Sequence, residues 1–520
     1  MNAAISCDDL ARLMVSKQRF AVLDVRERGE YNHCQIPYTT SLPRRQIEFR
    51  IAELVPDRKV QLIVYDDGGA RATLAAATLA RVGYQDVAVL DGGLSAWQHQ
   101  GRPTVDGVNV PSKAFGERVH HERNVPDLTP EELKSLQDRS RDLIILDVRT
   151  PEEYARFCIP GGVNVPGGDL ILWAEELKRQ NATNVIVNCA GRTRSIIGAA
   201  ALRRVGLTNV RALRNGTMGW VLAGFELERK SQRPAPTAPA KAVETATALA
   251  CRIAEEESIP WISARELPGK LETKSIDYLI DVRSQDEFAS AHVPGSISIP
   301  GGQAVQRADD FVAVRNGQIV FISNESARAV MTAYWYRQMG FSHVAVLRGG
   351  LRGWMDNGGS IENGSLRNEP MGFEAALQAV GVVDPSTIEV KTRDSSVLLL
   401  DVGSSLDFET SHIPGAKWIS RGWLEVKLPE LCPHRNRPII LTCADGRHSV
   451  LAALALSELG YRNIVVLGGG VSAWSTAGFH TEQGGTGCLV EPNDVVLSPS
   501  IRGTKEDMQR YLDWELTLKK

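Results

Sequence analysis

The chain has 520 residues, with 59 basic and 62 acidic side chains and a net charge of −3. It is too long for a single core, because one domain usually holds about 100 to 200 residues. The near-neutral balance gives no overall attraction to nucleic acid or to an anionic membrane, and no apolar run is as long as a membrane span.

The beginning of the sequence lacks the charged head and long apolar core of a secretion signal, so we expect a cytoplasmic protein. The eight cysteines form neither a CxxC pair nor a pattern typical of a disulfide framework. In a reducing compartment they are expected to be free thiols. The oligomeric state is left open by the sequence.

A single frame occurs four times along the chain. It consists of an acidic residue that closes an apolar run, a loop that opens a helix 42 residues later, and a tryptophan 31 residues after that. The acids are Asp24, Asp147, Asp281 and Asp401. The loops open at Asp66, Cys189, Ser323 and Cys443, and the tryptophans are Trp97, Trp220, Trp354 and Trp474.

The period of this frame is much longer than a solenoid repeat, so each copy should bury its own core. We therefore predict four domains with a linker and a tail. The predicted boundaries are 1–110 for copy one, 120–229 for copy two, 230–250 for a Pro/Ala linker, 251–362 for copy three, 370–482 for copy four and 483–520 for a C-terminal tail with a docking helix.

Within copy two the predicted elements follow in order as a strand at 143–146, a strand at 185–187, a helix at 196–205 and a strand at 210–213. Short β-branched runs that alternate with helices favour a mostly parallel sheet covered by helices on both faces. The predicted fold class is α/β, repeated four times.

Between the copies, residues 231–243 contain three prolines among alanines, which predicts an extended spacer that divides the chain into a first and a second pair of copies. In the tail, Thr504 and Asp507 resemble a capping box. Met508, Tyr511, Leu512 and Leu516 can form one apolar face there, which predicts a docking helix.

The loop of copy two reads CAGRTRS and lies between a buried type of strand and a helix. Such a junction directs backbone N–H groups and the positive end of the helix dipole at the centre of the loop. These groups, with Arg192 and Arg194, should lower the pKa of Cys189 below its usual value of about 8.5 and make the thiol a nucleophile. The residues expected to bind substrate here are Ala190, Gly191, Arg192, Thr193, Arg194 and Ser195.

The loop of copy four reads CADGRHS, with Cys443 again at the end of an apolar strand. Asp445 should raise the pKa of the thiol, whereas His448 could offset this effect when protonated. Cys443 is therefore the second candidate nucleophile, with a degenerate site as the alternative. The residues expected to bind substrate here are Ala444, Asp445, Gly446, Arg447, His448 and Ser449.

Copies one and three have no cysteine at the start of the loop, which reads DDGGARA at 66–72 and SNESARA at 323–329. A serine without an adjacent base is a poor nucleophile, and Asp66 would repel an anion. Structural or interface roles are expected for these two copies.

These features together resemble the rhodanese (thiosulfate sulfurtransferase) family. The features are a strand-end cysteine that opens a six-residue loop with a basic last residue, an upstream Asp-Val-Arg at 147–149, an Ile-Pro-Gly turn at 159–161 and a Gly-x-x-x-Trp ending at Trp220. The resemblance covers nearly the whole chain apart from linkers and tail. Copy four departs from it at Gly403, in place of the arginine, and at His448, in place of the last basic residue.

The resemblance implies that Cys189 takes the outer sulfur of a donor such as thiosulfate, becomes a persulfide, and passes that sulfur to cyanide or a thiol. Backbone amides and the two arginines would serve this chemistry without a metal or an organic cofactor. We expect Asp147 and Arg149 to tie the strand end to neighbouring loops rather than to react.

Three alternatives stay open. A 3-mercaptopyruvate sulfurtransferase is less expected, because two arginines in the loop favour a dianion such as thiosulfate. A non-catalytic scaffold of four rhodanese-like domains agrees with copies one and three. A cysteine-based phosphatase or arsenate reductase uses a related loop that is one residue longer between cysteine and arginine.

Overall fold

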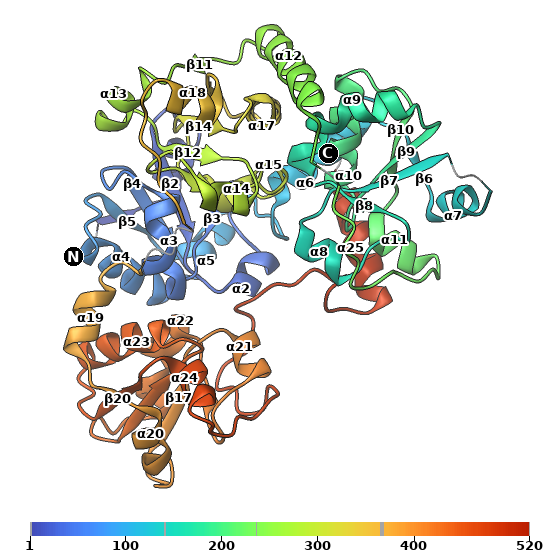
Figure 1. Ribbon diagram of the computed structural model, residues 1–520. Helices are drawn as coiled ribbons and strands as arrows, with labels where there is room; N and C mark the ends of the chain where they lie inside the picture. Colours follow the sequence, from blue (N-terminus) through green and yellow to red (C-terminus); the bar gives the residue numbers. More distant parts are fainter. Residues whose placement is uncertain (1–2, 140–141, 236, 365–368, 519–520) are drawn as a thin grey trace. The chain divides into compact units, whose positions relative to one another are not determined.

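A computed structural model describes residues 3–139, 142–235, 237–364 and 369–518. Each copy of the frame folds as a five-stranded sheet, and every strand pair in the four sheets is parallel. The strand order is the same each time and begins β1-β5-β4-β2-β3 in copy one. Helices flank the sheets (Figure 1). The predicted α/β fold, repeated four times, is confirmed.

The elements of copy one are β1 (Ala3–Ile5), α1 (Cys7–Met14), β2 (Phe20–Asp24), α2 (Arg28–His33), β3 (Thr40–Ser41), η1 (Arg44–Gln46), α3 (Ile47–Leu54), β4 (Gln61–Tyr65), α4 (Arg71–Arg81), β5 (Val87–Leu90) and α5 (Gly93–His99). Those of copy two are α6 (Val110–Glu122), β6 (Asp127–Leu128), α7 (Pro130–Arg139), β7 (Leu143–Asp147), α8 (Pro151–Arg156), β8 (Val163–Asn164), η2 (Gly167–Asp169), α9 (Leu170–Gln180), β9 (Asn184–Asn188), α10 (Thr193–Arg204), β10 (Val210–Leu213) and α11 (Gly216–Leu222).

The elements of copy three are α12 (Ala240–Glu256), β11 (Trp261–Ile262), α13 (Leu267–Glu272), β12 (Tyr278–Asp281), α14 (Gln285–Ser290), β13 (Ile297–Ser298), α15 (Gly301–Gln306), α16 (Ala308–Phe311), β14 (Ile319–Ile322), α17 (Ala327–Gln338), β15 (Val344–Leu347) and α18 (Gly350–Asp356). Those of copy four and the tail are α19 (Phe373–Ala379), β16 (Val382–Val383), α20 (Pro385–Lys391), β17 (Leu398–Asp401), α21 (Ser405–Thr410), β18 (Lys417–Trp418), α22 (Arg421–Leu431), β19 (Ile439–Thr442), α23 (Arg447–Glu458), β20 (Ile464–Leu467), α24 (Gly470–Thr476) and α25 (Lys505–Thr517).

The register of the sheets explains the constant spacing between the acid and the loop. In copy two, Asp147 at the end of β7 is level with Asn188 at the end of β9, directly before Cys189. The same pairing joins Asp401 to Thr442 in copy four. Because the carboxyl ends of parallel strands lie at one edge of a sheet, the acid and the loop are brought together at that edge.

A glycine turn holds each loop from the side. In copy two, the amide of Thr217 donates to the carbonyl oxygen of Cys189 at 2.9 Å. Gly216 before it has φ of 56°, and a Cβ there would lie 2.2 Å from that same oxygen. Only glycine fits this approach. The four amide donors to the loop openers are Leu94, Thr217, Leu351 and Val471.

The tryptophan of each frame forms a hydrogen bond near the C-terminal end of its domain. The indole nitrogen of Trp220 donates to the carbonyl oxygen of Glu226 at 2.8 Å, and Trp474 makes the corresponding bond to His480 at 2.7 Å. Both rings are buried in the core of their own copy, beside the sheet. The tryptophans are structural.

Contacts divide the chain into two compact units. One unit holds residues 1–108, 313–315 and 367–496, and the other holds residues 109–312, 316–366 and 497–520. Copies one and four therefore belong together, as do copies two and three with the tail. The expected pairing of copies one with two and three with four is wrong. Buried ion pairs of Arg44 with Glu425 and of Glu48 with Arg421 join copies one and four.

The expected extended spacer is also wrong in its last part. Helix α12 begins at Ala240, directly after its N-cap Pro239, because the alanine-rich stretch beyond the prolines favours a helix. This helix packs against α9 of copy two and α17 of copy three. Among the described residues, no helix is long and apolar enough to cross a membrane.

We predict that Gly216→Ala displaces the Cys189 loop. The new methyl group would overlap the Cys189 carbonyl oxygen, and the expected loss of stability is more than about 2 kcal/mol. Gly161→Ala is the matched control, because Gly161 has φ of 77° with open space around it, so only backbone strain of about 1 kcal/mol applies. Thermal unfolding of both variants measures the difference, and equal losses would contradict this account.

Candidate functional site

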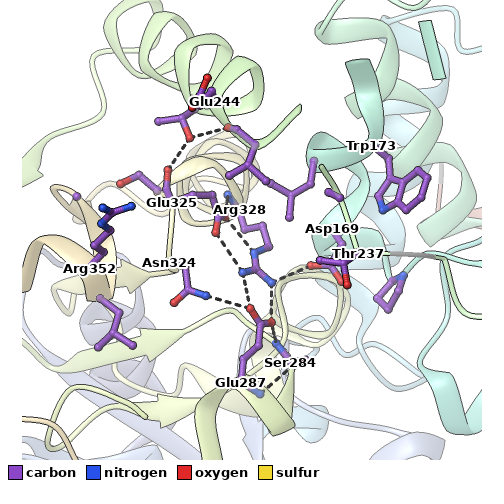
Figure 2. A pocket seen from close by; sticks show the side chains of 18 of the residues that line it. Asp169, Trp173, Thr237, Glu244, Ser284, Glu287, Asn324, Glu325, Arg328 and Arg352 are labelled. Carbon is purple, nitrogen blue, oxygen red and sulfur yellow. Dashed lines mark hydrogen bonds and ion pairs between the residues drawn. The ribbon is translucent and has the colours of Figure 1, made fainter. Parts of the chain in front are cut away.

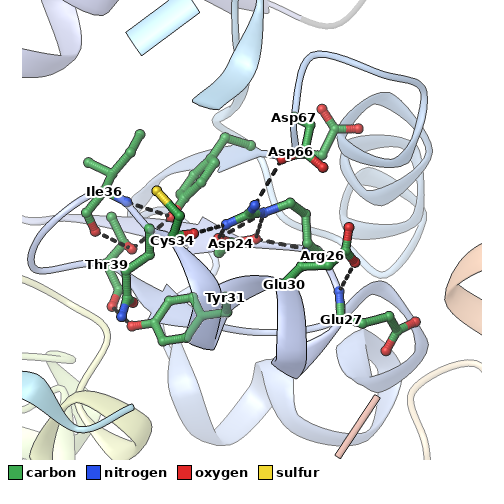
Figure 3. Close-up of polar contacts among 12 residues, drawn as sticks. Asp24, Arg26, Glu27, Glu30, Tyr31, Cys34, Ile36, Thr39, Asp66 and Asp67 are labelled. Atoms are coloured by element: carbon green, nitrogen blue, oxygen red, sulfur yellow. Dashed lines mark hydrogen bonds and ion pairs between the residues drawn. The ribbon is translucent and has the colours of Figure 1, made fainter. Parts of the chain in front are cut away.

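An aspartate and an arginine fix the strand end beside each of the first three loops. In copy one, Arg26 binds both carboxylate oxygens of Asp24 and donates to the carbonyl oxygen of Cys34 at 2.6 Å (Figure 3). It also reaches Asp67 of the loop at 2.8 Å. Arg149 binds Asp147 in the same way in copy two, and both are buried. Arg149 also donates to the carbonyl oxygen of Phe157 at 2.6 Å, so the pair ties the strand end to the neighbouring loop, as expected.

Cys189 lies at the end of β9 and is only 2% exposed. Its Sγ is 3.5 Å from the hydroxyl oxygen of Ser195, which itself donates to the carbonyl oxygen of Arg192 at 2.8 Å. Helix α10 begins at Thr193, so the amides of its first turn have no acceptor within the helix. The thiol therefore stands at a helix N-terminus with a hydroxyl group beside it.

Both arginines of this loop form ion pairs with buried or half-buried carboxylates. Arg194 binds Glu153 of α8 at 2.7 and 2.8 Å, and Arg192 binds Glu117 of α6 at 2.5 and 2.9 Å. Burial alone would raise the pKa of Glu153, but Arg194 outweighs it and lowers that pKa to about 2. The positive charge that the sequence places at the loop is thus largely balanced by acids from other elements.

The remaining predicted residues of this loop act through their backbone or packing. The carbonyl oxygen of Ala190 accepts the amide of Met218 at 3.0 Å. Thr193 packs closely on Gly116 of α6, and Gly191 lies against Met218 and the tail helix. Of residues 189–195, Ser195 contacts the thiol directly, whereas Arg192 and Arg194 are paired with acids of other elements.

The loop of copy one binds the carboxylate of its own first residue, Asp66. The carboxylate of Asp66 turns into its own loop, where Oδ1 accepts the amides of Gly68 and Gly69 at 2.8 and 2.9 Å. Oδ2 accepts the amide of Ala72 at 3.1 Å. Rather than repelling an anion from outside, Asp66 supplies the anion, so the cradle of this copy is already filled.

Copy three carries a closed network of ions at the same position. Arg328 binds Glu287 at 2.8 Å and also contacts Glu325 and Asp169 at 3.0 and 3.1 Å (Figure 2). Ser323 is fully buried, and its hydroxyl oxygen accepts the amide of Ala329 at 3.3 Å. The residues Asn324, Glu325 and Arg328 line a cavity of about 1480 Å³. This loop has no nucleophile.

In copy four the thiol of Cys443 is buried beside carboxylates. Burial, together with the charges of Asp401 and Asp445, raises the pKa of Cys443 to about 11, although Ser449 opposes the shift. Gly403 leaves Asp401 without the arginine found in the other copies. Burial consequently raises the pKa of Asp401 to about 7. These surroundings disfavour the thiolate form of Cys443.

His448 does not offset the raised pKa of Cys443, contrary to the expectation from the sequence. Burial, and then the positive charges of Arg421, Arg45 and Arg447, lower the pKa of His448 well below its usual range. The ring is neutral at pH 7 and stacks on Phe49 of copy one at 4.3 Å.

The other predicted residues of this loop lie together around Cys443. Asp445 accepts from Arg447 at 2.7 Å, so neither charge is free for a substrate. Ala444 accepts the amide of Ser472 at 3.0 Å, and Gly446 is the left-handed N-cap of α23 with φ of 90°.

Sequence reasoning missed the carboxylates that bind the loop arginines. Glu153 lies 41 residues before Arg194, and Glu30 and Glu287 stand at the same distance before Arg71 and Arg328. This constant spacing was a signal for Glu153. Glu117 and the residues of α25 that contact the Cys189 loop occur once each, so no repeat indicated them.

Comparisons with known proteins agree with this geometry. The family model for the rhodanese-like domain matches residues 6–100, 129–223, 263–357 and 385–477. A crystal structure of thiosulfate sulfurtransferase from Pseudomonas aeruginosa is 36% identical with a TM-score of 0.91, and the match covers 99% of this chain and 97% of that one.

Two curated relatives match parts of the chain. 3-Mercaptopyruvate sulfurtransferase of Escherichia coli is 22% identical over 36% of this chain and 82% of its own length. Thiosulfate sulfurtransferase of Azotobacter vinelandii is 29% identical over 29% of this chain, and this match spans only 55% of the relative.

We predict that Asp401→Asn stabilises the protein above neutral pH. As pH rises from about 4 to 7, the unfolded chain releases the Asp401 proton while the folded chain keeps it, so the wild type loses stability across this window. At pH 8 the free energy of unfolding of the variant should exceed that of the wild type by about 2 to 4 kcal/mol. Near pH 4 the two should have equal stability.

The matched variant is Asp147→Asn, which leaves Arg149 buried without its ion pair and should lose about 3 to 5 kcal/mol. Thermal unfolding between pH 4 and 8 measures both variants. A gain for Asp401→Asn that does not change with pH would contradict the assignment.

Proposed function

Because the chain belongs to the rhodanese family of sulfurtransferases, we propose that it moves a sulfane sulfur from thiosulfate to cyanide or a thiol through a persulfide on Cys189. The observation that carries this proposal is the position of Cys189 directly after β9, at the beginning of the loop that leads into α10. In copy one, three loop amides bind the carboxylate of Asp66, which stands at the position of Cys189, and this supports an anion site at the loop of copy two.

The transfer has two half-reactions. The thiolate of Cys189 attacks the outer sulfur of thiosulfate, the S–S bond of the donor breaks, and sulfite leaves with the bonding electron pair. The acceptor then attacks the outer sulfur of the persulfide, and the electron pair of that S–S bond returns to Cys189. With cyanide the product is thiocyanate. Loop amides stabilise the negative sulfur in both states.

Thiosulfate is the proposed donor, and 3-mercaptopyruvate is the alternative. The whole-length relative bears the name of a thiosulfate sulfurtransferase, whereas the 3-mercaptopyruvate sulfurtransferase matches about a third of the chain. The ion pairs of Arg192 and Arg194 weaken the argument from loop charge alone. A cytoplasmic location and the identity of the acceptor stay predictions.

We predict that thiosulfate adds one sulfur atom, about 32 Da, to the peptide that contains Cys189 and not to the one that contains Cys443. Cys189→Ser should remove most thiosulfate turnover, whereas Cys443→Ser should remove less than about a tenth, because a thiol with a pKa of about 11 is rarely ionised at pH 7.5. Mass spectrometry and steady-state rates test this. A persulfide on neither cysteine would favour the scaffold function.

A second prediction concerns the loop charge. Arg194→Ala should raise the Michaelis constant for thiosulfate by about fivefold, since it removes a cation next to the thiol. Glu153→Gln should lower that constant, because it releases Arg194 from its ion pair. Opposite directions in the two variants are the expected result of steady-state kinetics. A shift in the same direction would indicate that the pair only supports the loop.

A further inference from the structure

The C-terminal helix α25 packs against α11, the helix whose Thr217 amide donates to the carbonyl oxygen of Cys189. Figure 1 shows α25 close to α11, and it also packs on α6. Met508 and Leu512 form an apolar cluster with Met218 of α11. Lys113 of α6 places its ammonium group 4.9 Å from the ring of Tyr511 and 4.6 Å from that of Trp514. The predicted docking helix thus lies against copy two.

The face of α25 toward the loop carries a carboxyl group. Glu515 is only 3% exposed, and its Oε2 lies 3.2 Å from the position that a Cβ on Gly191 would take. Its Oε1 accepts the hydroxyl of Tyr511 at 3.0 Å. Within the described part of the chain Oε2 has no hydrogen-bond partner. A buried carboxylate oxygen without a partner is costly, so this atom indicates the position of a ligand hydrogen.

The chemistry of the two substrates decides which of them supplies that hydrogen. Thiosulfate has none at neutral pH and is suited to the amides of the loop. An acceptor thiol carries a proton at neutral pH and must lose it before it attacks the persulfide. The acceptor thiol therefore matches the unpartnered Oε2 of Glu515, and thiosulfate matches the loop amides.

We propose that Glu515 is the general base that takes the proton of an acceptor thiol in the second half-reaction at Cys189. This inference deepens the proposed function and rests on it. The S–H bond of the acceptor breaks, its proton goes to Oε2, and the acceptor sulfur bonds to the outer sulfur of the persulfide. The S–S bond to Cys189 breaks and its electron pair returns to Cys189, which leaves a protonated Glu515 and a small-molecule persulfide.

Groups on neighbouring elements act on the pKa of Glu515 in both directions. Burial raises the pKa of Glu515, and Lys113 and Arg192 on neighbouring elements oppose that shift, whereas Glu117 adds to it. Tyr511 donates its hydroxyl to Glu515, and burial and then the charge of Glu515 raise the pKa of Tyr511. An exposed glutamate would be a weaker base for a thiol.

The test compares two acceptors in single-turnover reactions of the full chain carrying Cys443→Ser. The Cys189 persulfide is formed with thiosulfate, excess donor is removed, and sulfur loss is followed at pH 7.5 with 2-mercaptoethanol or with sulfite, which has no proton to lose at sulfur. Glu515→Gln should slow transfer to 2-mercaptoethanol at least about tenfold and change transfer to sulfite less than about twofold. With the more acidic trifluoroethanethiol the loss should be smaller.

Asp513→Asn is the matched control, because it makes the same charge change on the exposed face of α25 and should alter neither rate. Equal slowing with both acceptors would assign Glu515 a structural role and overturn the proposal, as would an unchanged rate with 2-mercaptoethanol. If the wild type forms no persulfide, the proposed function itself fails, which is a separate outcome.

Discussion

The carbonyl oxygen of the first residue of each loop accepts an amide from the helix after the glycine turn, and the four sites depend on this bond. The distances are 2.8 to 2.9 Å in all four copies, and a Cβ on the glycine before the donor would overlap the same oxygen. Because the contact uses only backbone atoms, the side chain at this position can change without loss of the fold. One frame therefore carries aspartate, cysteine, serine and again cysteine.

What each loop can do depends on the charges that surround that side chain. Asp66 neutralises its own cradle of amides, and copy one needs no bound anion. Cys443 has the thiol but stands near two carboxylates, and one of them, Asp401, has Gly403 where the other copies have an arginine. Cys189 has both the thiol and the basic last residue of the loop, Arg194, and the nearby Asp147 is paired with Arg149. The four copies thus share the backbone hydrogen bond that positions the loop, and they differ in the charges around its first side chain.

The fold was predictable from the sequence because its signals are local and occur four times. The strands and helix expected around Cys189 lie within a few residues of β7, β9, α10 and β10. The pairing of the copies was not predictable, since it depends on side chains far apart in sequence, such as Glu48 and Arg421. The spacer at 231–243 was misinterpreted because a proline that ends one segment also caps the next helix at Pro239.

The candidate site was predictable in its residues but not in its electrostatics. The sequence showed two arginines beside Cys189 and did not show that Glu117 and Glu153 fold onto them. With these charges paired, the N–H groups at the start of α10 add to the positive potential that the arginines give the loop. In the proposed second half-reaction, Glu515 adds a carboxylate to this site from α25, an element of the tail that lies outside the four repeated frames.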